Sequence, residues 1–208
     1  MHIIGIDLEG VLVPEIWEML AKKTRIKELE LTTKDIPNYK DLMNSRIKVL
    51  KRKNIKAKEL FNIAKNIKPF RGAEKFLTEI RKNHQVIILS DTFFNLSQPI
   101  FKKLKFPTVF CHQLLIDNKG MVEGMKMCTI NHKKKIINFM NSISNQTIAI
   151  GDSYNDLAML KEAKFGILFK STREIISQNS NFFSCDSYQT LLKTINKKHK
   201  EWSLKNDK

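Results

Sequence analysis

The residues with the clearest chemical potential stand near the start of the chain, where an apolar run ends in a pair of carboxylates. The run Ile3–Ile6 is short and rich in β-branched side chains, which is typical of a buried strand, and Asp7 and Glu9 follow it. Alternate strand residues point the same way, so both carboxylates are expected on one face. Such a pair is costly unless a metal ion or a cation compensates it, although an acidic turn is the alternative interpretation.

Two later apolar runs, Gln-Val-Ile-Ile-Leu and Gln-Thr-Ile-Ala-Ile, also end in polar groups. The first is followed by Ser90 and Asp91, and the second by Gly151 and Asp152, with Asp156 just beyond. Ligands in open α/β sheets bind at the carboxyl ends of the strands. We therefore expect these groups to converge with the first pair at one edge of a sheet.

Oxygen donors of this kind suit a hard divalent cation and a phosphate group. Asp7 and Asp152 are expected to bind Mg²⁺, the usual choice where phosphate is also bound, and Ser90 and Lys133 suit phosphate oxygens. A carboxylate such as Asp7 can attack phosphorus and form an aspartyl phosphate. Glu9 can then protonate the leaving oxygen and later deprotonate the attacking water.

The elements that must position these groups follow from the hydrophobic periodicity. From Gly72 onward, strand patterns alternate with helix patterns, which indicates a mostly parallel sheet with helical crossovers. The predicted strands are 85–89, 108–111, 146–150 and 165–169, with a hairpin over 114–124, and the predicted helices are 73–82, 95–105, 131–141, 157–163 and 191–198. The first strand is too apolar to stand alone and is expected to join the same sheet.

Residues 14–70 carry helical patterns and no clear strand. Helices are predicted over 14–23, 39–53 and 57–67, with a polar stretch broken by Pro37 before the second. We therefore predict an α/β fold with a Rossmann-like parallel-sheet core, formed by residues 1–13 and 71–208, and a small helical cap. The cap, residues 14–70, is inserted after the first strand and is expected to lie over the carboxyl edge as a lid.

The charge balance raises a nucleic-acid alternative. The formal charge is +16, but the excess is nearly all lysine and is spread over the chain, with the densest runs at Lys133–Lys135 and Lys197–Lys200. Solvated helix faces account for such runs, and a positive field attracts small anionic substrates. We expect no nucleic-acid partner. A non-catalytic nucleic-acid-binding protein would instead show salt-dependent binding of DNA or RNA and no phosphatase activity.

The cysteines and the apolar segments indicate in which cellular compartment the protein is expected. Cys111, Cys128 and Cys185 are odd in number and scattered, which fits reduced thiols in a cytoplasm. No stretch is long enough to span a bilayer and no cationic leader precedes the first apolar run, so we expect a cytoplasmic protein without a membrane partner. A zinc site from the cysteines with His112 and His132 lacks the usual spacing. The sequence leaves formation of a homodimer open.

At this point the motifs resemble those of a known family. Four of them in order resemble the haloacid dehalogenase superfamily: Asp7-Leu-Glu9-Gly10-Val, Ser90, Lys133 and Gly151-Asp152-Ser-Tyr-Asn-Asp156. Further segments are similar to phosphoserine phosphatases, in particular the bifunctional phosphoserine phosphatase/homoserine phosphotransferase branch: Glu15-Ile-Trp17, Asp35-Ile-Pro37, Arg46, Leu89-Ser-Asp-Thr-Phe93 and Ser97-Gln-Pro99. The resemblance covers essentially the whole chain.

The resemblance implies catalytic and metal-binding roles for residues of the predicted core. Asp7 would be the nucleophile, and Glu9 the general acid/base whose backbone carbonyl also binds Mg²⁺. Asp7 and Asp152 would be the side-chain metal ligands. Lys133 would balance charge on the phosphoryl oxygens, and Asp156 would orient Lys133 or a metal-bound water.

Substrate-binding roles are implied in both the core and the cap. Ser90 and a backbone amide near Asp91 would bind the phosphoryl group, and Asn155 would hold the substrate. In the cap, Glu15 would bind the substrate ammonium and Arg46 the substrate carboxylate. An amino-acid phosphate needs one anion and one bidentate cation to recognise its backbone groups. Without the resemblance, Glu15 and Arg46 would be expected on solvated helix faces.

Two positions depart from the common pattern. Glu9 stands where most of the superfamily has aspartate, although the bifunctional branch has the same glutamate. Asp91 stands where ordinary phosphoserine phosphatases carry glycine, and it either forms a turn or faces an acceptor or the lid. The expected activity is Mg²⁺-dependent hydrolysis of phosphoserine, with transfer to homoserine. The alternative is a phosphatase or phosphotransferase for another small phosphomonoester.

Overall fold

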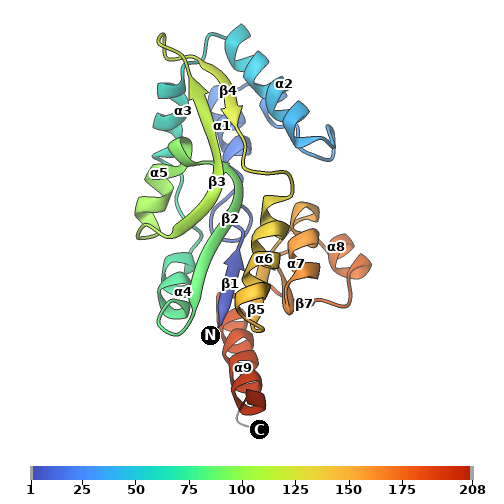
Figure 1. Ribbon diagram of the computed structural model, residues 1–208. Coiled ribbons are helices and arrows are strands. Elements are labelled where there is room, and N and C mark those ends of the chain that lie inside the picture. Colours follow the sequence, from blue (N-terminus) through green and yellow to red (C-terminus); the bar gives the residue numbers. More distant parts are fainter. Residues whose placement is uncertain (1, 207–208) are drawn as a thin grey trace.

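A single mixed sheet forms the centre of the chain, whose computed structural model describes residues 2–206 (Figure 1). The strand order is β4-β3-β2-β1-β5-β6-β7, and every neighbouring pair is parallel except β3 with β4. The strands are β1 (Ile3–Ile6), β2 (Gln85–Phe93), β3 (Thr108–Ile116), β4 (Val122–Lys126), β5 (Thr147–Gly151), β6 (Phe165–Phe169) and β7 (Phe183–Cys185). The predicted α/β fold with a mostly parallel sheet is confirmed.

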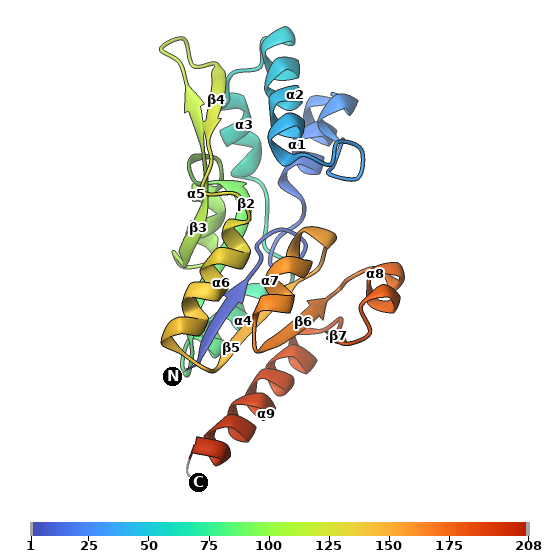
Figure 2. The ribbon, with the colours of Figure 1, turned by 45° about the vertical axis from the view of Figure 1, so that its right-hand side comes forward.

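Helices cover both faces of this sheet (Figure 2). They are α1 (Ile16–Thr24), α2 (Tyr39–Arg52), α3 (Ala57–Ala64), α4 (Ala73–Ile80), α5 (Phe94–Lys103), α6 (His132–Ile143), α7 (Leu157–Glu162), α8 (Arg173–Gln178) and α9 (Tyr188–Asn206), with short 3₁₀ turns at Lys27–Leu29 and Tyr154–Asp156. None of the helices within residues 2–206 has both the length and the apolar character that a membrane span needs.

Strand alternation divides the core into two apolar clusters. Ile4 and Ile6 of β1 pack in the cluster that contains buried residues of α4, α5 and α9. Ile3 and Leu89 pack in the cluster that contains α6, α7 and α8. Because both faces are covered, β1 is fully buried, and its carboxyl end is held at the centre of the sheet edge. That position fixes where Asp7 must lie.

The segment 14–70, which we call the cap segment, lies beyond the carboxyl edge and contains α1, α2 and α3 (Figure 1). The β3–β4 hairpin packs alongside it. Lys56 and Met121 form an isolated antiparallel bridge, and the Ala57 N–H donates to the Gly120 carbonyl over 2.9 Å. The helices of the cap segment are therefore braced by a hairpin from the core half of the sequence.

Several element boundaries differ from the sequence prediction. The second strand was predicted to end at Leu89, but β2 continues to Phe93, which pairs with His112 across a register shift. The predicted strand 108–111 and the first arm of the hairpin form one continuous strand, β3. Ser90 and Asp91 are turn-favouring residues that ended the predicted strand, whereas burial of Thr92 and Phe93 extends it. Helix α8 and strand β7 were not predicted, since each is too short to show a period.

Candidate active site

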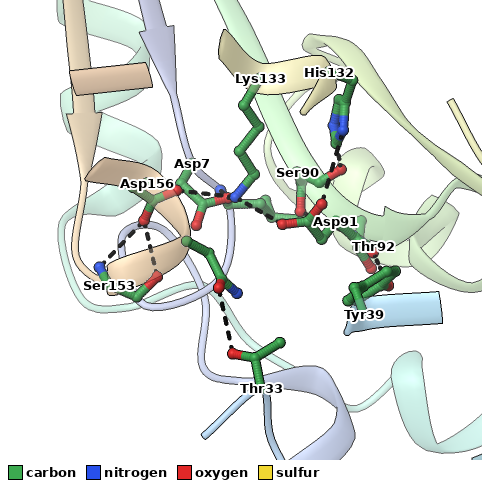
Figure 3. Close-up of polar contacts among 12 residues, drawn as sticks. Asp7, Thr33, Tyr39, Ser90, Asp91, Thr92, His132, Lys133, Ser153 and Asp156 are labelled. Carbon is green, nitrogen blue, oxygen red and sulfur yellow. Dashed lines mark hydrogen bonds and ion pairs between the residues drawn. The ribbon is translucent and has the colours of Figure 1, made fainter. Parts of the chain in front are cut away.

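Lys133 lies at the centre of a group of carboxylates at the carboxyl edge (Figure 3). Its ammonium nitrogen, Nζ, lies 2.9 Å from Asp156 Oδ1, 3.0 Å from Asp7 Oδ1 and 3.3 Å from Asp91 Oδ2. The first turn of α6 carries this lysine, and only 8% of its side chain is exposed. Burial opposes its charge, but Asp156, Asp7 and Asp91 outweigh burial and raise the pKa of Lys133 well above its ordinary value.

Asp7 follows β1 and is 5% exposed. Its Oδ1 accepts the Leu8 N–H over 2.8 Å and contacts Lys133, whereas its Oδ2 has no hydrogen bond or ion pair within residues 2–206. Burial and the nearby Asp156 carboxylate raise the pKa of Asp7 well above its ordinary value, although Lys133 opposes the rise. The carboxylate therefore lies in surroundings that one lysine does not fully compensate.

Asp156 is fully buried and uses both of its oxygens. Oδ1 accepts a hydrogen bond from Lys133, and Oδ2 accepts from the Asp152 N–H, the Ser153 N–H and the Ser153 hydroxyl over 3.1–3.2 Å. The same loop opens with Gly151, where β5 ends. Asp156 therefore fixes the position of Lys133 and the shape of the loop that carries Asp152.

The carboxylates of Asp7 and Asp152 fit a divalent cation. Ligand oxygens of Asp7, Asp152 and Asp156 lie within 4.8 Å of one another, and Asp152 Oδ1 is buried without a hydrogen-bond partner among residues 2–206. Burial, followed by the charge of Asp156, raises the pKa of Asp152 to about 7. Since Asp156 is saturated by hydrogen bonds, Asp7 and Asp152 are the carboxylates that can hold a hard cation.

Gly10 makes room for this carboxylate pair. Its φ is +73°, and a Cβ atom placed on it would lie 2.2 Å from Asp152 Oδ2. A side chain at this position would overlap the Asp152 carboxylate and would also need the left-handed backbone region. The glycine of the first motif is therefore required by close packing of the site.

Glu9 connects the first motif to the cap segment. Its Oε2 accepts the Ile16 N–H over 2.8 Å at the beginning of α1. Burial and the neighbouring Glu15 carboxyl group raise the pKa of Glu9 to about 8. In the absence of a cation, this carboxyl group is therefore protonated at neutral pH and is able to donate a proton.

Asp91 has histidine neighbours that sequence reasoning did not assign to the site. His112 Nε2 lies 3.5 Å and His132 Nδ1 lies 3.8 Å from Asp91 Oδ1. Burial favours the neutral acid, but Lys133, followed by the nearby His112, outweighs it and lowers the pKa of Asp91. Asp91 is therefore an ionised carboxylate held between a lysine and two imidazole rings.

Hydrogen bonds to the backbone hold the two rings in place beside Asp91. His112 Nδ1 accepts the Cys128 N–H over 3.2 Å, so the proton of its neutral ring is on Nε2, facing Asp91. His132 Nε2 lies 3.2 Å from the Ser90 carbonyl oxygen. The sequence marks His112 and His132 only as candidates for a zinc site with Cys111 and Cys128. Nothing in their spacing predicts that they lie next to Asp91.

Arg46 is buried, contrary to the expectation for a helix face without the resemblance. It is 6% exposed, its guanidinium carbon lies 4.7 Å from the Trp17 ring centre, and its Nη2 donates to the Leu31 carbonyl. Its Nε is buried without a partner among the described residues. Glu15, at the N-cap of α1, is exposed. The guanidinium therefore retains a free donor next to the candidate site.

Nine of the ten predicted site residues line one cavity of about 730 Å³: Asp7, Glu9, Glu15, Arg46, Ser90, Asp91, Lys133, Asp152 and Asn155. The tenth, Asp156, lies behind Lys133. Besides the bond from the Ile16 N–H to Glu9, two hydrogen bonds connect the cap segment to the core at this cavity: Tyr39 Oη donates to the Asp91 carbonyl, and Thr33 Oγ1 donates to Asn155 Oδ1 over 3.3 Å (Figure 3).

Comparison with known proteins agrees with this geometry. The model of the haloacid dehalogenase-like hydrolases matches residues 1–164. The chain belongs to this family. It is 41% identical over 191 residues to a protein of Pseudomonas aeruginosa named phosphoserine phosphatase ThrH, covering 92% of this chain and 93% of that one. It is 39% identical to a Pseudomonas syringae protein named phosphoserine phosphatase, covering 93% and 81% of the two chains.

Solved structures show the same fold for this family member. A structure described as a phospho-aspartyl intermediate analogue of phosphoserine phosphatase superimposes with a TM-score of 0.76. It is 20% identical and covers 93% of this chain and 98% of its own. The family resemblance inferred from the four motifs is confirmed, and the chain is an enzyme of a hydrolase family.

Proposed function

We propose that this chain is a cytoplasmic, Mg²⁺-dependent phosphoserine phosphatase that acts through an aspartyl phosphate on Asp7 and also transfers the phosphoryl group to homoserine. One observation carries the proposal: a single cavity is lined by the Asp7 carboxylate, a buried lysine and a buried arginine. The first two suit phosphoryl transfer, and the third suits an amino-acid carboxylate. The names of the two Pseudomonas relatives support the choice of phosphoserine.

The first half-reaction forms the acyl phosphate. Asp7 Oδ2 attacks phosphorus, and the bond between phosphorus and the serine oxygen breaks. Glu9, whose pKa is raised to about 8, gives its proton to the departing oxygen. Lys133 holds Asp7 Oδ1 and offsets charge on the phosphoryl oxygens. Mg²⁺, held by Asp7, Asp152 and the Glu9 carbonyl, would supply further charge neutralisation when bound.

The second half-reaction releases Asp7. The Glu9 carboxylate takes a proton from water or from the acceptor hydroxyl, and that oxygen attacks phosphorus. The bond between phosphorus and Asp7 Oδ2 then breaks, which gives inorganic phosphate or a new phosphomonoester. Exclusion of water by the cap segment would favour transfer over hydrolysis.

Recognition of the amino-acid part would involve the cap segment and the phosphate loop. Arg46 would bind the substrate carboxylate through its unpartnered Nε side, and Glu15 would bind the ammonium. Ser90 would donate to a phosphoryl oxygen. Asn155, which already contacts Thr33 of the cap segment, would hold the substrate beneath it.

A second cavity supports a route for an acceptor. It measures about 520 Å³ and shares Tyr39, Asp91 and Lys133 with the first cavity. Asp91 therefore stands between the phosphoryl site and a second space. Its carboxylate can accept a hydrogen bond from a hydroxyl or an ammonium group of an amino-acid acceptor.

The decisive experiment measures turnover of phosphoserine with Mg²⁺, with and without homoserine, and follows inorganic phosphate and phosphohomoserine separately. We expect release of phosphate alone in the first case and both products in the second. The Asp91→Gly variant should hydrolyse phosphoserine but lose most of the transfer product. A panel of phosphomonoesters is the control for substrate identity. Faster turnover of an ester without an amino-acid group would reject phosphoserine as the substrate, and an absence of phosphohomoserine would reject transfer.

A further inference from the structure

Three histidines gather at the end of the sheet opposite the active site. His2 and His84 immediately precede β1 and β2, whose parallel register pairs Ile3 with Gln85. The Gln85 N–H donates to the His2 carbonyl over 3.0 Å, which fixes the two histidines side by side. His199 reaches them from α9, which begins at the body of the protein and runs past the amino-terminal edge (Figures 1 and 2).

The three rings are close together and buried. Ring centres lie 4.0 Å apart for His2 and His199, 5.2 Å for His84 and His199, and 5.7 Å for His2 and His84. His2 is 9% and His84 is 7% exposed, and His199 is half-buried. The Nδ1 atom of every ring is buried without a hydrogen-bond partner among residues 2–206. Three unpartnered buried nitrogens in one place are costly unless something binds them.

We propose that His2, His84 and His199 form a binding site for a borderline divalent transition-metal ion such as Zn²⁺. Each ring offers a nitrogen ligand, and the three ligand atoms lie within 4.8 Å of one another. Nitrogens bound to one tetrahedral Zn²⁺ at about 2.0–2.1 Å lie about 3.4 Å apart, so small ring rotations would complete the site. Three protein ligands leave a fourth position for water or another small ligand.

The protonation state of the rings is suited to ligation. Burial, followed by repulsion from His199, lowers the pKa of His2 to about 4, and the same two causes lower the pKa of His84. Neutral imidazole binds zinc, copper, nickel and cobalt, whereas the oxygen donors that Mg²⁺ prefers are absent from the three-histidine set. The nearby ammonium of Lys198 lies 3.1 Å from Glu201, which offsets its charge.

The proposed ion would connect three distant parts of the chain. It would join the first strand, the second strand and the C-terminal helix, while the catalytic carboxylates lie at the opposite edge of the sheet. The Trp202 ring stacks on His2 at a centre-to-centre distance of 5.8 Å and covers one side of the cluster. An ion that binds the folded state only would stabilise the fold and hold α9 against the sheet.

The test uses the full chain without an affinity tag, stripped of metal and kept in excess Mg²⁺ so that oxygen sites are occupied. Cu²⁺ is added as a spectroscopic probe, and Zn²⁺ is used in thermal unfolding. We expect nitrogen hyperfine coupling in the Cu²⁺ spectrum and a higher unfolding midpoint with Zn²⁺. His84→Gln and His199→Gln should each weaken Zn²⁺ binding at least tenfold and abolish the rise in midpoint.

His112→Gln is the matched control, because it removes a histidine from the Asp91 cluster instead. It should bind Zn²⁺ as the wild type does. A wild-type Cu²⁺ spectrum without nitrogen coupling would overturn the proposal, and this measurement does not depend on any variant folding. Wild-type Zn²⁺ affinity in both His84→Gln and His199→Gln would also overturn it, as would loss of binding in His112→Gln with those two variants unaffected.

Discussion

Buried polar groups are arranged differently at the two ends of the sheet. At the carboxyl edge, Asp7, Asp91 and Asp156 surround one buried lysine, whose Nζ lies within 3.3 Å of an oxygen of each carboxylate. At the amino edge, three histidines lie together with their Nδ1 atoms unpartnered. The first arrangement tolerates charge because opposite charges compensate it. The second avoids charge, and it leaves lone pairs available for an ion.

Substitution of Asp7, the proposed nucleophile, should give the largest difference between the two edges. Asp7→Asn keeps the shape of the side chain but removes the attacking carboxylate, so kcat for phosphoserine should fall at least about 10³-fold. His84→Gln at the other edge should leave kcat within about twofold, because distant sites act independently. Steady-state kinetics on both variants checks this. Similar losses in the two variants would mean that the edges are coupled.

Loss of the buried cation should destabilise the protein strongly. Lys133→Met leaves three carboxylates facing one another, so the free energy of unfolding should fall by about 3–5 kcal/mol in metal-free protein. The neighbouring Lys134→Met is the control: Lys134 is exposed and lies 3.7 Å from Glu162, so the change should stay within about 0.5 kcal/mol. Urea unfolding measures both. Equal effects would contradict a compensating role for Lys133.

Removal of Arg46 should weaken binding of the substrate carboxylate without affecting the phosphoryl-transfer step at the carboxyl edge. Arg46→Ala should raise KM for phosphoserine by about 10- to 100-fold, since a buried carboxylate–guanidinium contact is lost, and should affect a phosphomonoester without a carboxylate much less. Arg52→Ala removes an exposed arginine of the same helix that pairs with Glu28 and should change neither value. An equal loss for both substrates would assign Arg46 a structural role.

The pH dependence of stability should have opposite signs at the two edges. In metal-free protein, burial raises the pKa of Glu9 to about 8, so its stabilising contribution is full below about pH 4.5 and is lost as pH rises through about 8. The pKa of His2 is lowered to about 4, so its contribution is full above about pH 6.5 and is lost as pH falls toward 4.

This sign difference can be measured by urea unfolding across the pH range. Glu9→Gln should remove a fall in stability that extends from about pH 4.5 to 8, and His2→Gln should remove a rise in stability that extends from about pH 4 to 6.5. Added Mg²⁺ should also reduce the fall in stability between about pH 4.5 and 8, because the cation favours ionised carboxylates. A single variant that removed both the fall and the rise would indicate that the two groups are not independent.

The carboxyl edge was largely predictable from the sequence, whereas the amino edge was not. Asp7 and Asp152 each follow a buried strand, and Ser90 lies in the carboxyl-terminal half of β2. Parallel strands bring their carboxyl ends together, so local pattern and topology suffice. His2 and His84 also flank strands, but nothing in a single histidine marks it as part of a cluster. His199 comes from a helix whose packing angle no local pattern predicts. The partners of Asp91 were missed for the same reason, since they depend on how β3 and α6 approach β2.

Gly10 has a consequence for the tolerance of this chain to change. Any β-carbon at position 10 would collide with the Asp152 carboxylate, and the backbone there adopts a φ of +73°. In a saturation-mutagenesis library selected for growth that depends on this enzyme activity, position 10 should therefore be as depleted of variants as position 7, and even alanine should be rejected. The site therefore requires the absence of a β-carbon at position 10 as strictly as it requires the carboxylate at position 7.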